Sequence, residues 1–118
     1  MIKSFKYAIS GIVYASKEKT FKILLIIALI VTLFAIFIPV TLIEFSVLVL
    51  TIIIILGLEL LNSQVERTLN IISPGKNQTV KEIKDISAAA VLIACLGSII
   101  IGLLIFLPHI LEMLIFSR

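Results

Sequence analysis

The chain has 118 residues, of which 61% are hydrophobic and 14% charged, and its mean hydropathy is +1.29. A water-soluble fold would lack the polar residues that cover a soluble surface, so the composition excludes that class and predicts an integral membrane protein. A spanning helix needs roughly 20 residues, so the length allows a single domain, residues 1–118, with three spans. The formal net charge of +3 is modest, and we expect no nucleic-acid partner.

Residues 1–16 are expected to form an amphipathic helix that lies in the membrane interface. Apolar side chains recur here at helical spacing, and polar side chains lie outside that stripe. The segment is too polar to span the bilayer, and it lacks the small-residue cleavage pattern of a secretory signal.

Three apolar stretches predict membrane-spanning helices, and hence an all-α fold, at residues 21–38, 45–61 and 86–107. Pro39 and Pro108 are expected to end the first and third helices, because proline readily ends a helix. A short outer turn containing Glu44 is expected before the second span, whose helical pattern continues to about Ile72. Three spans from a single chain would form only a thin bundle, so we expect the chain to oligomerise.

The clearest helix breaker is the Ser-Pro-Gly-Lys-Asn-Gln loop at residues 73–78. Thr79 is expected to cap the last helix, with Glu82 completing a capping box. Most basic residues lie before the first span or between the second and third, so these regions and the N-terminus are expected on the cytoplasmic side. They are Lys3, Lys6, Lys17, Lys19, Lys22, Arg67, Lys76, Lys81 and Lys84.

Four polar residues of the second helix, Glu59, Asn62, Glu66 and Asn70, are spaced to share one helical face. At about 100° per residue they fall within roughly 80° of one another. A carboxyl group near hydrocarbon is costly unless it is paired, protonated or functional, and Glu59 directly follows an apolar run. An ordinary interfacial carboxyl, hydrogen-bonded to a neighbouring helix, is the alternative.

Glu18, Lys84 and Asp85 are expected at the same depth as this polar stripe, where the first and third spans begin. Two carboxylates can hold Mg²⁺ on nucleotide phosphates, and a lysine can neutralise phosphate charge. The chain contains no Gly-x-x-x-x-Gly-Lys phosphate loop, Gly-rich kinase loop or His-Arg-Asp motif. The residues alone therefore predict a membrane protein with an acidic, metal-capable cluster at its inner face.

The segment Glu59-Leu-Leu-Asn-Ser-Gln-Val-Glu66 closely resembles the Glu-x-x-Asn-Thr/Ser-Ala-Ile/Val-Glu motif of the prokaryotic diacylglycerol kinases. Residues 84–92, Lys-Asp-Ile-Ser-Ala-Ala-Ala-Val-Leu, resemble the family's second block. The resemblance implies a lipid kinase of the bacterial cytoplasmic membrane, assembled as a homotrimer with active sites between neighbouring subunits. Mg-ATP is the implied donor, and the primary hydroxyl of diacylglycerol is the implied acceptor.

The resemblance also implies roles for individual residues. Glu18 and Glu66 match the acids that hold the metal on ATP. Glu59 matches the general base beside the lipid hydroxyl, and Asn62 supports the same site. Ala88 matches a position near the lipid. Six further residues match positions near the nucleotide: Tyr7, Gly75, Lys76, Asn77, Lys84 and Asp85.

Two residues depart from the family pattern. Gln64 replaces an alanine on the face opposite the polar stripe, where little effect is expected. Asn70 replaces an aspartate, which preserves shape but removes one negative charge from the cluster.

Three alternatives stand beside diacylglycerol phosphorylation. Undecaprenol also presents a primary hydroxyl, and residues 102–108 are similar to the branch that includes undecaprenol kinases. The second alternative is a catalytically silent relative that acts as a membrane assembly subunit or a lipid-binding subunit. A small multidrug-resistance transporter would need four spans with a glutamate deep in the first, and residues 21–38 contain no acid.

Overall fold

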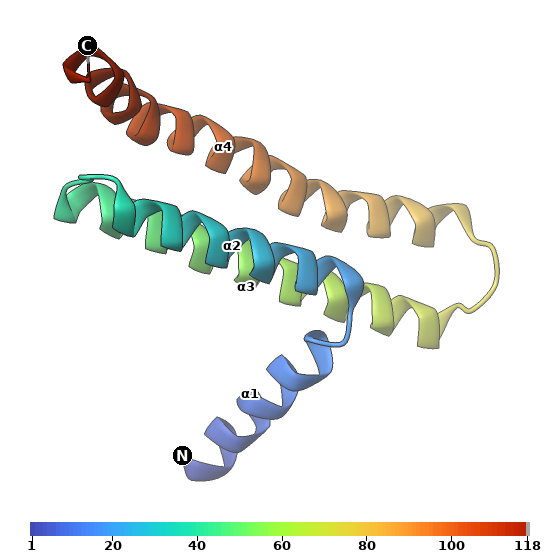
Figure 1. The fold of residues 1–118 in the computed structure, drawn as a ribbon. Helices are drawn as coiled ribbons and strands as arrows, with labels where there is room; N and C mark the ends of the chain where they lie inside the picture. The colour runs from blue at the N-terminus through green and yellow to red at the C-terminus, as the bar shows by residue number, and fades with distance from the viewer. Residues whose placement is uncertain (118) are drawn as a thin grey trace.

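The structure is a computed structural model that describes residues 1–117. Within these residues the chain forms four helices: α1 (Ile2–Ala15), α2 (Lys19–Phe37), α3 (Leu42–Ile72) and α4 (Gln78–Phe116). The last three are long and apolar enough to cross a membrane, which confirms the three expected spanning helices. Figure 1 shows α1 projecting away from the bundle that α2, α3 and α4 form.

Helix α3 is the centre of the bundle, because α2 and α4 both pack along it. A small apolar core of Ala35, Leu48 and Ile105 joins the three helices near the α2–α3 turn, which we call the turn end. There the rings of Phe34 and Phe106 also meet edge to face, with centroids 5.0 Å apart. The other end of the bundle, which carries the α3–α4 loop, is called the loop end.

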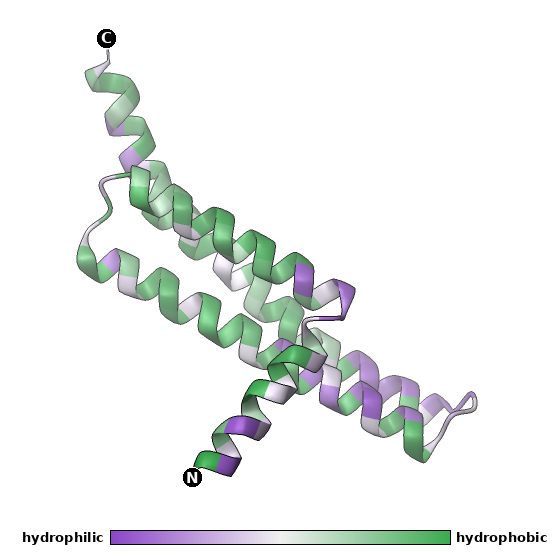
Figure 2. Cartoon of the chain, turned by 60° about the horizontal axis from the view of Figure 1, so that its bottom comes forward, coloured by the Kyte–Doolittle hydropathy of each residue, from purple (hydrophilic) through white to green (hydrophobic). Residues whose placement is uncertain are grey.

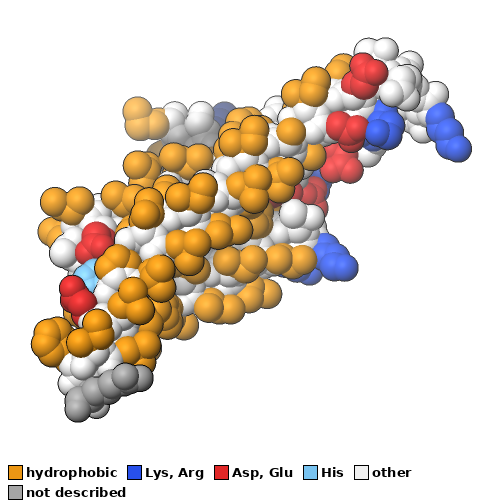
Figure 3. Space-filling model, turned by 90° about the horizontal axis from the view of Figure 1, so that it is seen from above, with side chains coloured by type: hydrophobic (Ala, Val, Ile, Leu, Met, Phe, Trp, Pro, Cys, Tyr) orange, Lys and Arg blue, Asp and Glu red, His pale blue; other side chains and the backbone are white. Residues whose placement is uncertain are grey.

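Most large apolar side chains point outward, as Figure 3 shows for one face of the bundle. Leu104 on α4 and Ile30 on α2, for example, are 70% and 60% exposed. With 31 residues at 1.5 Å each, α3 is about 46 Å long and exceeds the ~30 Å hydrocarbon core of a bilayer. Figure 2 shows polar residues gathered at the loop end, which is the part suited to leave the membrane.

The expectation that Glu44 lies in a turn is wrong, because this residue belongs to the first turn of α3. The Thr41 hydroxyl accepts from the Glu44 amide at 3.1 Å, and the Glu44 carboxylate accepts from the Thr41 amide at 3.0 Å. These reciprocal bonds form a capping box, which satisfies amides that would otherwise lack partners.

The expected Thr79 cap is also wrong. Asn77 caps α4, and its side-chain oxygen accepts from the Val80 amide at 3.2 Å. Thr79 is therefore already helical, and the Glu82 carboxylate accepts from the Gln78 side-chain amide at 3.4 Å. An asparagine is at least as good a cap as a threonine, and with Asn77 as the cap α4 begins two residues earlier than expected.

Pro108 does not end α4 as expected, since the helix continues through it to Phe116. A proline removes one helical hydrogen bond, which membrane helices tolerate through local adjustment. His109 Nε2 lies 3.0 Å from Glu44 Oε1, so this part of α4 is attached to the start of α3. This contact joins the two helices beside the proline.

Candidate active site

A cavity of about 710 Å³ opens where α2 begins, between that helix, α3 and α4. All four members of the predicted polar stripe line it: Glu59, Asn62, Glu66 and Asn70. The prediction that these residues share one face is therefore confirmed. The volume lies within the roughly 300–1,000 Å³ typical of ligand pockets.

Glu59 and Ser63 are the buried polar residues of α3. Glu59 is 3% exposed and Ser63 is 7% exposed, on successive turns of the same face. Burying a carboxyl group costs free energy unless it has a polar partner. Glu59 lines a cavity and does not fill an apolar core. This carboxyl group therefore lies at the wall of the cavity, where a bound molecule could reach it.

Glu18 reaches the same cavity from the junction between α1 and α2. It occupies the N-cap position of α2, but its side chain does not cap that helix. Instead one carboxylate oxygen accepts from the Ser63 hydroxyl, and the other accepts from Arg67 Nε at 3.0 Å and Nη2 at 2.7 Å. The Ser63 hydrogen bond, assisted by Arg67 and opposed by burial, holds the pKa of Glu18 below its ordinary value. Glu18 is therefore ionised at neutral pH.

The carboxylates fit a magnesium site of the kind that a nucleotide completes. Glu18 and Glu66 both line the cavity, as the predicted metal role requires. Within residues 1–117, no group of three or more His, Cys, Asp or Glu side chains comes together as a metal cage. Mg²⁺ commonly uses one or two carboxylates together with substrate phosphates and water, so two carboxylates match this mode of binding.

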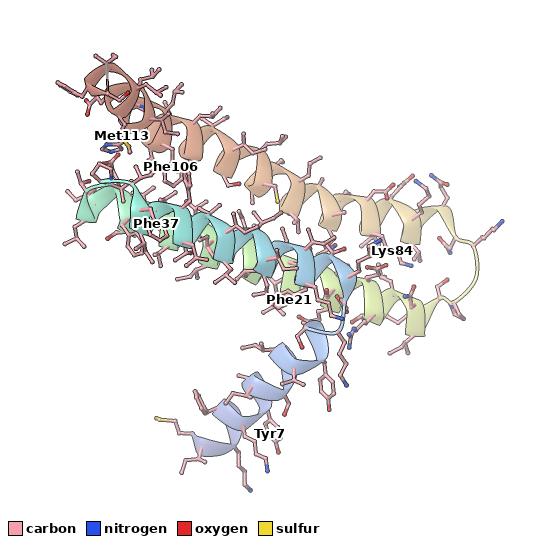
Figure 4. The ribbon with its side chains drawn as sticks, viewed as in Figure 1. Tyr7, Phe21, Phe37, Lys84, Phe106 and Met113 are labelled. Carbon is pink, nitrogen blue, oxygen red and sulfur yellow. The ribbon has the colours of Figure 1, made fainter. Side chains whose placement is uncertain are left out.

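A second cavity, of about 490 Å³, lies at the loop end beside the first. Gly75, Lys76, Asn77 and Lys84 line it, so the structure brings these four predicted nucleotide residues together. Lys84 points from α4 toward α3 in Figure 4, where its Nζ donates to Asn70 Oδ1 at 2.5 Å. Because Asn70 lines the first cavity, this hydrogen bond lies between the two.

Two predicted nucleotide residues lie elsewhere. Tyr7 is 70% exposed on α1 and lies away from the bundle in Figure 4. Asp85 pairs with Lys81 at 2.8 Å on the exposed side of α4, and it lines neither cavity. Neither residue lines a cavity in the described chain, and their contacts with nucleotide stay predictions.

Ala88, which the resemblance places near the lipid, lines the first cavity. Beyond it an apolar cavity of about 340 Å³ continues between the spanning helices toward Phe106. Leu24 and Cys95 line both cavities, so the polar site borders the apolar one directly. A molecule with a polar head and an apolar tail matches this arrangement.

Ser63 and Arg67 also line the first cavity, and the sequence patterns did not predict either as a site residue. Ser63 lies one turn beyond Glu59, and Arg67 one turn beyond Ser63, so helical spacing could have placed both on the edge of the stripe. Their pairing with Glu18 depends on how α2 packs against α3, and no local pattern reports that.

The family model described as prokaryotic diacylglycerol kinase matches residues 6–106. An undecaprenol kinase from Bacillus subtilis is 36% identical over 107 residues, which cover 90% of this chain and 87% of the relative. A diacylglycerol kinase from Synechocystis sp. is 30% identical over 117 residues, which cover 98% of this chain and 67% of the relative.

Proposed function

Because the chain belongs to the prokaryotic diacylglycerol kinase family, we propose that it phosphorylates the primary hydroxyl of a membrane lipid with Mg-ATP, converting diacylglycerol to phosphatidic acid. The observation that carries this proposal is the cavity in which buried Glu59 faces the two acids Glu18 and Glu66. It combines a carboxyl group near hydrocarbon with two carboxylates suited to a metal–nucleotide complex.

In the proposed reaction Glu59 accepts the proton of the lipid hydroxyl at a carboxylate oxygen. The hydroxyl oxygen attacks the γ-phosphorus while the bond from that phosphorus to the β–γ bridging oxygen breaks, and ADP leaves. Asn62, one turn away on the same face, orients the acceptor. Glu18 and Glu66 would hold the metal, and Lys84 would neutralise phosphate charge from the loop side. When bound there, Mg²⁺ would supply charge neutralisation on the transferring phosphoryl group. Transfer is direct and in line, without a phosphorylated enzyme intermediate.

The border between polar and apolar cavities supports a lipid acceptor. With its hydroxyl at Glu59, a lipid can extend its chain past Leu24 and Cys95 into apolar surroundings. The nucleotide then enters from the loop end, where Lys76 and Lys84 lie. Positioning two substrates at one point is the main catalytic requirement of phosphoryl transfer.

The proposed function also involves a cellular location and an oligomeric state. The basic loop end and the N-terminus face the cytoplasm of a bacterium, and the spans cross its cytoplasmic membrane. Helix α1 lies in the interface with its apolar side chains in the membrane. Three copies associate as a homotrimer, which would cover part of the apolar surface that one chain exposes and supply further groups to each site.

Undecaprenol is the second candidate acceptor. The Bacillus subtilis relative that carries this activity in its name shares the higher identity of the two relatives. Both lipids present a primary hydroxyl at the interface, so the same catalytic residues serve either.

Purified protein in mixed micelles, given Mg-ATP labelled at the γ-phosphate, is expected to label a lipid. Diacylglycerol and undecaprenol are offered separately, and the more strongly labelled lipid is the main acceptor. Glu66→Gln serves as the inactive control because it removes a proposed metal ligand. Absence of label in both lipids, from protein that remains folded and oligomeric, would instead indicate a catalytically silent relative.

Asn70→Asp is expected to preserve or increase activity. The Asn70 oxygen accepts from Lys84, and an aspartate oxygen of the same shape can accept that bond while restoring the charge usual in the family. Initial rates of lipid phosphorylation at saturating Mg-ATP measure the effect, with Asn70→Leu as the variant that cannot accept. A large loss in Asn70→Asp would contradict the assigned alignment of this residue.

A further inference from the structure

Arg67 connects α3 to the α1–α2 junction through contacts that no expected role explains. Its Nε and Nη2 donate to one Glu18 oxygen at 3.0 and 2.7 Å, and Nη2 lies 3.5 Å from the Tyr14 carbonyl oxygen. Ser63 donates to the other Glu18 oxygen. Both oxygens of a proposed metal ligand are thus engaged by the protein itself.

This engagement conflicts with metal binding by Glu18. A carboxylate oxygen offers two lone pairs, and the guanidinium fork uses both on one oxygen. The Ser63 hydroxyl uses one lone pair of the other oxygen, so little acceptor capacity is left for a cation. Positive charge from Arg67 also opposes the approach of a divalent ion. Glu18 therefore cannot serve Arg67 and a metal fully at the same time.

The electrostatics of the cavity explain why a cation belongs there. Three carboxylates, Glu18, Glu59 and Glu66, line it together with the two cations Lys19 and Arg67. Like charges at short distance destabilise one another, and a nearby guanidinium relieves that repulsion. In the empty site Arg67 pairs with Glu18, one of the carboxylates that a metal ion would otherwise neutralise.

Arg67 is also suited to a second partner. Its side chain is 53% exposed, so it can rotate away from Glu18 without disrupting the packed interior. A guanidinium binds phosphate oxygens as a two-pronged donor, in the same manner as it binds a carboxylate. A triphosphate in the cavity would therefore offer Arg67 an equivalent bond at the moment when the metal takes Glu18.

We propose that Arg67 is a positioning residue that exchanges partners, pairing with Glu18 in the empty site and with nucleotide phosphate once the metal binds Glu18. The inference rests on the proposed function, because it assumes that Glu18 is a metal ligand for ATP. It assigns Arg67 two consequences of opposite sign. The residue weakens metal binding in the absence of nucleotide and strengthens the binding of Mg-ATP.

The test compares Arg67→Gln, Arg67→Lys and Lys22→Gln in purified protein. Lys22 is exposed near the start of α2, so its replacement removes one positive charge outside the cavity. Electron paramagnetic resonance measures Mn²⁺ affinity without nucleotide, with Mn²⁺ in place of Mg²⁺. Steady-state kinetics give KM for Mg-ATP, KM for lipid and kcat. Circular dichroism shows whether each variant keeps its helices.

Arg67→Gln is expected to bind Mn²⁺ about fivefold more tightly, the effect of removing one partly exposed ion pair. The same variant is expected to raise KM for Mg-ATP about tenfold, with KM for lipid unchanged, because only the phosphate contact is lost. Arg67→Lys keeps the charge but not the fork, so its Mn²⁺ affinity should stay near wild type and its KM for Mg-ATP should rise about threefold. Lys22→Gln should change neither quantity.

Mn²⁺ affinity that stays constant or falls in Arg67→Gln would overturn the exchange. A residue that only orients Glu18 would strengthen the binding of both the free metal ion and Mg-ATP, so its loss would not tighten Mn²⁺ binding. If Arg67→Gln does not fold, Arg67→Lys decides, and an unchanged KM for Mg-ATP in that variant would equally overturn the proposal. The Mn²⁺ measurement needs no turnover. Failure of the exchange is therefore distinguishable from failure of the kinase function, which shows as a wild-type protein inactive on both lipids.

Discussion

Glu59→Gln is expected to lower kcat for lipid phosphorylation about 100-fold or more, the usual contribution of a general base. Glu59 is only 3% exposed, and glutamine has nearly the same shape, so the replacement should fit there without opening a new cavity. It cannot accept the proton of the lipid hydroxyl. Metal and nucleotide binding should stay near wild type, because the proposed metal ligands are Glu18 and Glu66.

The measurement pairs initial rates with Mn²⁺ affinity and KM for Mg-ATP. Glu112→Gln is a matched control, since it removes an exposed carboxylate from the turn end of α4, away from the cavity. A Glu59→Gln variant that loses both activity and metal binding would show that this carboxylate is a ligand. Activity within about threefold of wild type would exclude the base role, because base catalysis contributes far more.

Glu66→Gln is expected to reduce kcat/KM for Mg-ATP about 100-fold or more and to weaken Mn²⁺ binding about tenfold. A metal ion on transferring phosphate contributes several kcal/mol, and each 1.4 kcal/mol corresponds to about tenfold in rate. Glutamine retains one oxygen but loses the charge that a hard cation needs. The main defect should therefore be in the binding of metal and nucleotide, unlike that of Glu59→Gln.

Titration of activity with Mg²⁺ separates the two variants. Glu66→Gln should recover part of its rate at high Mg²⁺, because added cation compensates for weaker binding, whereas Glu59→Gln should not. Circular dichroism and size-exclusion chromatography in detergent verify that both variants remain folded. Normal Mg²⁺ dependence together with low kcat in Glu66→Gln would remove this residue from the metal site.

Helix N-termini show where local patterns were insufficient. The chain contains two Thr-x-x-Glu sequences, at Thr41 and at Thr79. The first forms a capping box, whereas the second lies inside α4 because Asn77 caps that helix earlier. Both sequences satisfy the same rule, so the choice depends on which residue the preceding loop brings to the helix end.

The ends of the long helices illustrate a related limit. Pro108 was expected to end α4, yet the helix continues for two turns beyond it and His109 pairs with Glu44. Sequence alone gives the local cost of a proline, about 3 kcal/mol or more in a helix interior. It does not reveal that a neighbouring helix lies beside this proline and contacts His109.

The sequence by itself determined the membrane class, the three spanning helices and the polar stripe of Glu59, Asn62, Glu66 and Asn70. These properties follow from composition and from the 3.6-residue period of a helix, which act over neighbouring residues. The motif also identified the family, which the comparisons show over most of the chain.

Only the tertiary structure decided which residues from different helices meet. It placed Ser63 and Arg67 on Glu18, 45 and 49 residues away along the chain, and Lys84 on Asn70. It also left Tyr7 and Asp85 outside both cavities. Periodicity fixes the face on which a side chain lies, but the partner of that face depends on how the helices pack, which is a property of the whole chain.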